Sequence, residues 1–266
     1  LRQHDLVQVQ WVTLSSGTRS TPARPLTDRQ SFPPVQARPN ETSVAVFDDL
    51  LVIVGGGTVD PDLLQELYAS GGHVVGADGG ADAIVDAGLK PELIVGDFDS
   101  LKTPHAWLGK TRLMQIAEQE TTDFEKALYS TRAPVTAALG MTGRRFDHTL
   151  AALDAVAKYA HRRRIVLVDE EDVALGLTEA FSFTVEPGER VSIHPLQPVT
   201  FWRSEGLKYP LDAVKLAPGV RTGTSNEALT GPFRIVPEEG VHAPYLLILP
   251  RAYLAPLIAK LLLEKR

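Results

Sequence analysis

At residues 93 to 100 the chain reads Leu93-Ile94-Val95-Gly96-Asp97-Phe98-Asp99-Ser100, an apolar run followed by two acids. The apolar residues predict a buried parallel strand that ends just before Asp97. In open α/β sheets, ligands bind beyond the carboxyl ends of the strands. Carboxylates at that edge suit Mg²⁺, which is usually held by one or two carboxylates, waters and substrate phosphates. A plain turn is the structural alternative, because Asp and Ser are common turn formers.

Three more junctions between a predicted strand and a predicted helix carry acids. Asp78 follows the apolar residues 73–76 and is flanked by glycines that let a ligand approach the backbone. Thr122 and Glu125 form a capping box, so a helix begins there and places Asp123 in its first turn. Asp147 belongs to Gly143-Arg144-Arg145-Phe146-Asp147-His148, which follows the predicted strand at 135–140. Capping explains one acid per helix, but neither the Asp97 and Asp99 doublet nor the arginines.

The first half of the chain alternates short apolar runs with helical segments. Leu50-Leu51-Val52-Ile53-Val54 predicts the first strand, and Asp60 with Pro61 predicts the start of the first helix. Further helices are expected at 81–88, 122–132 and 147–164, and a last buried strand at 164–168. Apolar strands that alternate with helices indicate a parallel sheet covered on both faces. We therefore expect a Rossmann-like α/β catalytic domain over residues 46–170.

The pattern changes after about residue 170. Residues 181–185 and 190–194 alternate apolar and polar side chains, and Pro187-Gly188 supplies a turn between them. Short alternating strands separated by turns indicate an antiparallel sandwich. A final apolar run at 253–263 predicts a packed helix. The expected second domain is a β-sandwich with a C-terminal helix over residues 171–266.

The first 45 residues differ from the remainder of the chain. Residues 15–42 are rich in Ser, Thr, Pro, Arg and Gln and contain few apolar side chains. Such a segment cannot offset the entropy lost on ordering, so we expect a disordered tail over residues 1–45. A transit peptide is a weaker alternative, because Asp5, Asp28 and Glu41 are atypical of such peptides.

Composition excludes several classes of protein. The formal net charge of −6 argues against a nucleic-acid partner, which would require a basic face. The basic cluster His161-Arg162-Arg163-Arg164 is expected to be a solvated helix end. The absence of cysteine excludes disulfides and thiol chemistry. No apolar run reaches the ~20 residues that span a bilayer, so no membrane contact and a cytoplasmic location are expected.

The four acidic motifs, taken in their order, resemble the thiamine pyrophosphokinase family. They read Ala-Asp-Gly-Gly-Ala from Ala77, Gly-Asp-Phe-Asp-Ser from Gly96, Thr-Asp-Phe-Glu-Lys from Thr122 and Gly-Arg-Arg-Phe-Asp-His-Thr from Gly143. The resemblance continues through residues 187–192, 205–211 and 224–227, and so extends from about Leu50 to the C-terminus. Each motif is weak alone, but seven of them in one order make the resemblance specific.

The resemblance implies a reaction and a set of residues. The reaction is Mg²⁺-dependent transfer of diphosphate from ATP to the hydroxyl of thiamine, which gives thiamine diphosphate and AMP. Family members are homodimers whose active sites are shared between subunits. The implied metal ligands are Asp97, Asp99 and Asp123, and together with Asp78 they form the catalytic set, with Asp123 as the proton acceptor. ATP and its diphosphate are assigned to Asp78, Arg144, Arg145, Asp147 and His148, and thiamine to Gln119, Asp123, Tyr209, Ser225 and Asn226.

Several of these assignments have alternatives. The family commonly has Asp where this chain has Glu120, which we therefore expect to lie outside the innermost metal ligands. Tyr209, which could stack on a thiazolium cation, competes with a core-packing role. Ser225 and Asn226 could simply form a turn. In a homodimer, these three residues would contribute to the partner's site.

Other functions fit parts of the sequence. Gly55-Gly56-Gly57 resembles a dinucleotide-binding loop, but Asp60 replaces its third glycine, which disfavours an NAD oxidoreductase. A metal-dependent phosphohydrolase could use the pair Asp97 and Asp99, the first of them as a nucleophile. A non-catalytic thiamine- or nucleotide-binding protein is also conceivable, although the near-complete set of acids argues against it.

Overall fold

The computed structural model describes residues 44–102, 107, 109–240 and 242–264. The expected tail lies outside these residues except for its last two positions. Of those, Ala45 is buried and begins β1 (Ala45–Val46), which pairs in parallel with β6 (Thr131–Arg132). Strand β1 therefore begins within the range that the sequence assigned to the tail.

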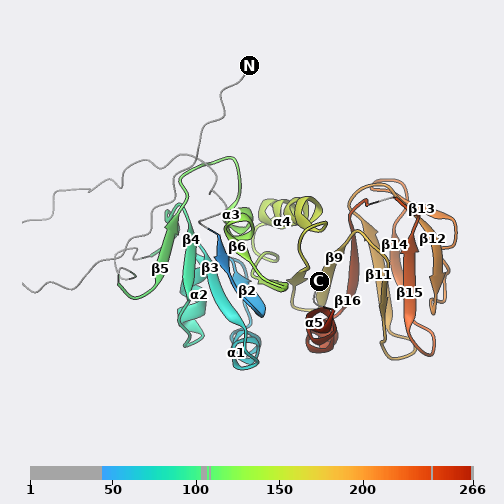
Figure 1. The fold of residues 1–266 in the computed structure, drawn as a ribbon, viewed down its shortest axis with the longest axis horizontal. Coiled ribbons are helices and arrows are strands. Elements are labelled where there is room, and N and C mark those ends of the chain that lie inside the picture. Colours follow the sequence, from blue (N-terminus) through green and yellow to red (C-terminus); the bar gives the residue numbers. More distant parts are fainter. Residues whose placement is uncertain (1–43, 103–106, 108, 241, 265–266) are drawn as a thin grey trace, which may run out of the picture.

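A sheet of ten strands runs through the molecule, in the order β14-β11-β16-β9-β8-β7-β2-β3-β4-β5. The last six strands in this order are parallel, as the apolar runs of the first half predicted. Their bounds are β8 (Ile165–Val168), β7 (Val135–Leu139), β2 (Leu50–Val54), β3 (His73–Ala77), β4 (Leu93–Gly96) and β5 (Arg112–Gln115). Figure 1 shows this sheet extending from β5 at the left to the sandwich at the right.

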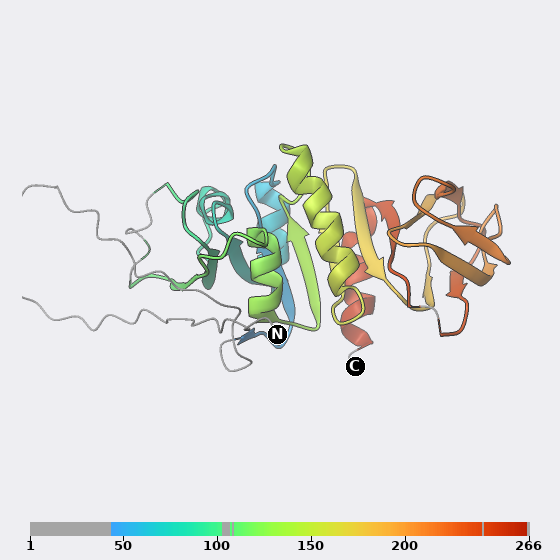
Figure 2. The same ribbon diagram turned by 90° about the horizontal axis from the view of Figure 1, so that it is seen from above.

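Helices cover both faces of the parallel part of the sheet. α1 (Pro61–Ala69), α2 (Gly80–Asp86) and α5 (Leu254–Leu263) pack on one face, and α3 (Asp123–Ser130) and α4 (Phe146–Tyr159) pack on the other (Figure 2). The side chains of β2 explain this arrangement, because Leu50, Val52 and Val54 join the first core while Leu51 and Ile53 join the second. Alternate residues of a strand point to opposite faces, so a strand that is apolar throughout requires cover on both.

The second half of the chain is antiparallel, as predicted, but it continues the same sheet. A tight connection between Val168 and Asp172, in which the Asp169 amide donates to the Asp172 carbonyl at 2.9 Å, turns β8 into the antiparallel β9. The extension consists of β9 (Asp172–Leu177), β16 (Tyr245–Pro250), β11 (Arg190–Pro195) and β14 (Gly223–Glu227). A separate antiparallel sheet has the order β10-β15-β12-β13, with bounds Phe181–Phe183, Phe233–Pro237, Val199–Glu205 and Val214–Leu216. The expected boundary at residue 170 thus falls in a hairpin, and the division into two domains remains a proposal.

Three helices end earlier than the sequence predicted, and the first of them, α2, ends at Asp86. α3 ends at Ser130, because the next two residues form β6, and α4 ends at Tyr159. The basic cluster after α4 is solvated only in part, because His161 and Arg162 are exposed whereas Arg163 and Arg164 are half-buried. Arg163 is half-buried and donates to the Thr131 carbonyl at 2.6 Å and to Thr136 Oγ1 at 2.9 Å, and Arg164 donates to the Glu264 carbonyl at 2.6 Å. These guanidinium groups therefore satisfy carbonyls at the ends of α3 and α5.

The remaining helical segment is a short 3₁₀ turn, Arg251–Tyr253, which leads from β16 into α5. None of the helices in the described ranges is long and apolar enough to cross a bilayer. The cytoplasmic location expected from the sequence stays a prediction.

Candidate functional site

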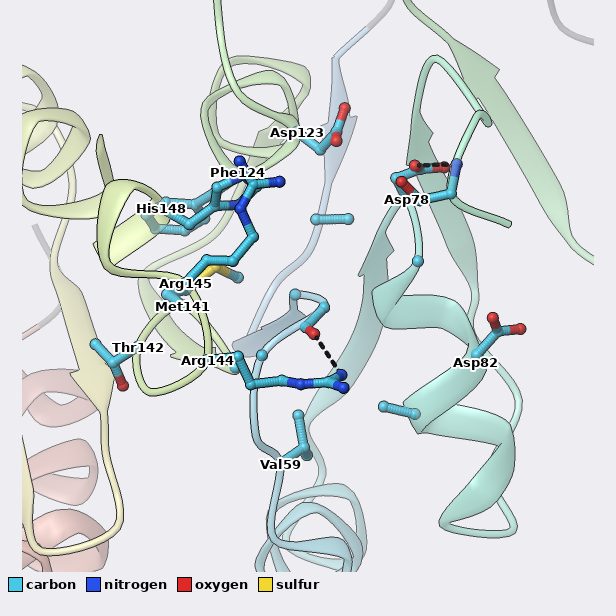
Figure 3. Close-up of a pocket in the computed structure, with 18 of the residues that line it drawn as sticks. Val59, Asp78, Asp82, Asp123, Phe124, Met141, Thr142, Arg144, Arg145 and His148 are labelled. Carbon is cyan, nitrogen blue, oxygen red and sulfur yellow. Dashed lines mark hydrogen bonds between the residues drawn. The ribbon is translucent and has the colours of Figure 1, made fainter. Parts of the chain in front are cut away.

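A large cavity lies at the carboxyl ends of the parallel strands. Its volume is about 610 Å³. The first strand, β2, leads to β3, β4 and β5 on one side, and the chain returns to β7 and β8 on the other. Open α/β sheets bind ligands where the strand order reverses in this way. The loops after β2 and β7 both line the cavity, and Asp78 and Asp123 lie at one end of it (Figure 3).

The two loops at this point require glycine. The Gly57 amide donates to the Gly140 carbonyl at 2.9 Å, and a Cβ on Gly57 would lie 2.5 Å from that oxygen. A Cβ on Gly80, at the start of α2, would lie 1.8 Å from the Val54 carbonyl oxygen. A side chain at Gly57 would push the loop after β2 away from the loop after β7, and a side chain at Gly80 would push α2 away from the end of β2. The two glycines therefore allow these backbone segments to lie close together beside the cavity.

Three of the expected acids converge beside this cavity. Ligand atoms of Asp78, Asp97 and Asp123 all lie within 4.8 Å of one another. They come from the ends of β3 and β4 and from the first turn of α3. Gly96 makes the convergence possible, because a Cβ there would lie 2.8 Å from Asp78 Cβ and 3.2 Å from Asp123 Oδ1. We call these three residues the acid cluster.

Asp78 is the most buried member of the acid cluster, with 1% of its surface exposed. Its φ of 44° lies in the left-handed region, which L-residues seldom adopt. The Ser100 amide donates to Asp78 Oδ2 at 3.0 Å, whereas Oδ1 has no hydrogen-bond partner among the described residues. Burial and the nearby Asp123 carboxylate raise the pKa of Asp78 to about 6. A buried carboxylate oxygen without a protein partner fits a cation, so the residues present suit a metal ion.

The other two members of the acid cluster, Asp97 and Asp123, both contact the ammonium group of Lys126. Lys126 Nζ lies 3.1 Å from Asp123 Oδ1 and 3.4 Å from Asp97 Oδ2. Burial raises the pKa of Asp123, although Lys126 opposes that shift. For Asp97, burial also acts upward, but hydrogen bonds from Gln119, from the Asp99 amide and from Lys126 outweigh it and lower the pKa. Sequence reasoning missed Lys126 as a site residue, although its position three residues after Asp123 on a predicted helix was a usable signal.

The neighbours of the acid cluster occupy different positions. Gln119 Nε2 donates to Asp97 Oδ2 at 2.7 Å, so Gln119 contacts the cluster directly. Asp99 is exposed, accepts a hydrogen bond from Ser100 Oγ at 2.8 Å and lies outside the cluster, so its role as a metal ligand stays a prediction. Glu120 is exposed and also lies outside the cluster. Glu118, which sequence reasoning did not select, accepts bonds from the Thr121 amide at 3.0 Å and from the Tyr129 hydroxyl at 2.8 Å.

The arginine loop after β7 lines the opposite side of the cavity. Arg144 reaches the glycine loop, residues 55–57 after β2, where its Nη1 donates to the Gly56 carbonyl at 3.4 Å (Figure 3). Arg145 forms a two-point ion pair with Asp147, at 2.6 Å and 3.1 Å. The pair is exposed, and the Arg145 guanidinium lowers the pKa of Asp147 to about 2. His148 lines the same cavity, so this loop presents cationic groups where an anionic ligand would enter.

Of the five residues expected to bind thiamine, Gln119 and Asp123 lie at the acid cluster, whereas the other three lie in the second half of the chain. Asn226 is buried, and its side chain accepts from the Tyr209 amide at 3.0 Å and donates to the Tyr209 carbonyl at 2.7 Å. Tyr209 has 60% of its surface exposed, which excludes the core-packing alternative. Ser225 is exposed with a φ of 57°, and its amide donates to Ser192 Oγ at 2.9 Å. β14 forms one edge of the long sheet and β5 the other, so one chain does not bring these residues to the acid cluster (Figure 1).

Comparison with known proteins adds independent findings. Residues 64–168 match the family model described as "Thiamin pyrophosphokinase, catalytic domain", and residues 181–241 match "Thiamin pyrophosphokinase, vitamin B1 binding domain". Thiamine pyrophosphokinase 1 of Oryza sativa subsp. japonica is 26% identical over 183 residues, which cover 56% of this chain and 69% of that protein. Thiamin pyrophosphokinase 1 of Caenorhabditis elegans is 26% identical over 155 residues, which cover 53% of this chain and 63% of that protein.

A solved structure resembles most of the described fold. The thiamin pyrophosphokinase of Geobacillus thermodenitrificans superimposes with a TM-score of 0.63 and 26% identity, and the match covers 76% of this chain and 97% of that one. The same mixed sheet and separate antiparallel sheet are therefore found in both proteins.

Proposed function

We propose that this chain, which belongs to the thiamine pyrophosphokinase family of diphosphate-transferring enzymes, transfers diphosphate from ATP to the hydroxyl of thiamine. The observation that carries this proposal is the convergence of Asp78, Asp97 and Asp123 beside a cavity lined by glycine and arginine loops. Such a site offers oxygen ligands for a metal and cationic groups for phosphates side by side. Phosphoryl-transfer catalysis consists largely of positioning and electrostatic stabilisation of this kind.

ATP is proposed to bind in the cavity at the strand reversal. The backbone of residues 55–57 would lie against the nucleotide, because these three glycines line the cavity and carry no side chain between the backbone and a ligand. Arg144 and Arg145 would neutralise phosphate oxygens, with His148 beside them and Asp147 orienting Arg145. Asp78, which lines the same cavity, would face the phosphates from the other side.

Mg²⁺ is proposed to bind at the acid cluster. Asp97 and Asp123 would hold it, Asp99 remains a candidate ligand from the same turn, and Asp78 would support it directly or through water. The unpartnered Oδ1 of Asp78 supports a cation at this point. When bound, Mg²⁺ would neutralise charge on the transferred diphosphate.

Thiamine is proposed to bind between two subunits of a homodimer. Gln119 and Asp123 would contact it from one chain, and Tyr209, Ser225 and Asn226 would belong to the partner's contribution. The exposure of the Tyr209 ring supports this arrangement, because an aromatic face suits a thiazolium cation. The buried Asn226 side chain would act indirectly, by fixing the backbone of Tyr209.

The transfer step is proposed to use the chain's own acids for proton movement. The thiamine hydroxyl oxygen would form a bond to the β-phosphorus of ATP while the bond from that phosphorus to the oxygen of AMP breaks. The hydroxyl proton would pass to Asp123, whose burial and raised pKa suit a proton acceptor. The products are thiamine diphosphate and AMP.

Incubation with ATP, Mg²⁺ and thiamine tests this reaction. We expect AMP release that depends on thiamine, together with thiamine diphosphate. Phosphate release from ATP or phosphoesters without thiamine would favour the phosphohydrolase alternative. Binding of thiamine or ATP without any product would favour the non-catalytic alternative.

A further inference from the structure

Lys126 places a buried positive charge inside the acid cluster. Its side chain has only 2% of its surface exposed, and its Nζ lies 3.1 Å from Asp123 Oδ1 and 3.4 Å from Asp97 Oδ2. Both distances connect the ammonium to carboxylates that are proposed to hold Mg²⁺. An ammonium so deeply buried cannot move into solvent without disturbing α3, on which its neighbours Ala127 and Leu128 are also buried. The ammonium and the metal must therefore share these carboxylates.

The charges of the acid cluster determine how the Lys126 ammonium affects the binding of a metal ion to the same carboxylates. Three carboxylates carry three negative charges, and Lys126 reduces the sum to two, which one divalent ion cancels. An ammonium and a divalent cation that touch the same carboxylates repel each other strongly in a partly buried site. Substrate phosphates add negative charge and offset this repulsion, since Mg²⁺ readily combines one or two carboxylates with phosphate oxygens.

We propose that Lys126 is a positioning residue that fixes Asp97 and Asp123 and weakens divalent-cation binding by the substrate-free protein, so that tight cation binding requires nucleotide phosphates. The inference rests on the proposed metal site. It assigns to Lys126 a role in the order of binding: the cation enters with the nucleotide or after it.

Binding of Mn²⁺, measured by electron paramagnetic resonance, tests the inference without any turnover. In the absence of nucleotide, Lys126→Met should bind Mn²⁺ at least about tenfold more tightly than wild type, because the repelling charge is gone. With a non-hydrolysable ATP analogue present, the wild-type affinity should rise by at least about tenfold, and that of Lys126→Met should rise less. Lys158→Met is the matched control, since Lys158 pairs with Glu125 and is 48% exposed. It should bind Mn²⁺ like wild type.

Further measurements keep the result decisive. Lys126→Gln removes the charge but keeps a hydrogen-bond donor, and it should reproduce the tighter binding if Lys126→Met folds poorly. Unchanged or weaker Mn²⁺ binding by a folded charge-removing variant would overturn the inference, as would wild-type affinity that is the same with and without nucleotide. Asp97→Asn separates the two proposals: if it leaves Mn²⁺ binding intact, the metal site itself is wrong, whereas if it abolishes binding only the role of Lys126 is in question.

Discussion

Asp97 is the residue on which the proposed metal site depends most. Its carboxylate belongs to the acid cluster and accepts bonds from Gln119 and Lys126. Asp97→Asn keeps the size and turn propensity of the side chain but removes the charge, so we expect turnover to fall by at least ~10²-fold. Stability without metal should fall modestly at neutral pH, because the lowered pKa of Asp97 means that its ionised form is favoured in the folded state.

Steady-state kinetics and thermal unfolding of the same preparation check this prediction. Asp154→Asn is the matched control, because Asp154 is an exposed acid on α4 outside the cluster, and its substitution should leave both measurements unchanged. An Asp97→Asn protein that is less stable yet turns over like wild type would assign Asp97 to a structural turn.

The stability of the metal-free protein should depend on pH through Asp78. The folded-state pKa of this residue is raised to about 6 from an ordinary value of 3.8. A raised acid pKa favours the protonated folded state, so its contribution is fully present below 3.8 and is lost as pH rises through about 6. In EDTA, Asp78→Asn should therefore be more stable than wild type at pH 7.5, by of order 1 kcal/mol, and the difference should shrink at pH 5. Denaturant unfolding at both pH values measures it, and a difference independent of pH would contradict the prediction.

Among the site residues, the sequence predicted the acids better than the side chains that contact them, such as Lys126. Asp78, Asp97 and Asp123 each follow an apolar run or begin a helix, so their convergence at one sheet edge could be anticipated. Asp99 belongs to the same motif but lies outside the cluster, because successive residues of a turn point in different directions. The contact of Lys126 with Asp97 joins residues 29 apart in the chain, and only the folded packing of α3 against β4 creates it.

Among the elements, the glycine loop after β2, residues 55–57, offers a matched pair of positions that test a close backbone contact. A Cβ on Gly57 would lie 2.5 Å from the Gly140 carbonyl oxygen, whereas a Cβ on Gly56 would meet nothing within 4 Å. We expect Gly57→Ala to destabilise the fold by about 1–3 kcal/mol, because the two loops must move apart. The neighbouring substitution Gly56→Ala should stay within about 0.5 kcal/mol of wild type. Equal effects of the two substitutions on the free energy of unfolding would show that the close contact is unimportant.

Local patterns predicted the elements well and their ends less well. The N-cap Asp60 and the Pro61 start of α1 are as expected, because capping depends on neighbouring residues alone. The early end of α3 depends on Thr131 pairing with Ala45, which lies far away in the sequence. Likewise, the role of Arg163 depends on carbonyls of β6 and α3 that no local pattern reveals.

For the whole molecule, the proposed shared site makes a prediction about mixed dimers. Asp97→Asn inactivates the acid cluster of a chain, and Tyr209→Ala removes the proposed thiamine contact that the chain gives to its partner. Each variant alone should be weakly active. Random mixing after co-expression makes about half of the dimers mixed, and each mixed dimer has one intact site, so activity should recover to about a quarter of wild type.

Kinetics of separately purified and co-expressed variants, with dimers confirmed by sedimentation, provide the measurement. No recovery above the mean of the two variants would place Tyr209 outside the partner's site. Asp97→Asn co-expressed with Asp123→Asn is the control, because both changes affect the same proposed half of the site, and it should not recover.

The sequence predicted the two types of sheet in the molecule, but it did not predict that parallel and antiparallel strands join in one sheet. Apolar runs indicated the parallel strands, and alternating segments indicated the antiparallel ones. The continuous ten-stranded sheet was not foreseen, because the β8 to β9 hairpin at Asp169 has the same composition as a linker between domains.

The fate of the two outer phosphates of ATP tests the central claim most directly. With Mg²⁺ and thiamine, ATP labelled at either the β- or the γ-phosphorus should transfer its label to thiamine in equal amounts, with one AMP formed for each thiamine diphosphate. Transfer of the γ-label alone, with ADP as the nucleotide product, would contradict diphosphate transfer by this site.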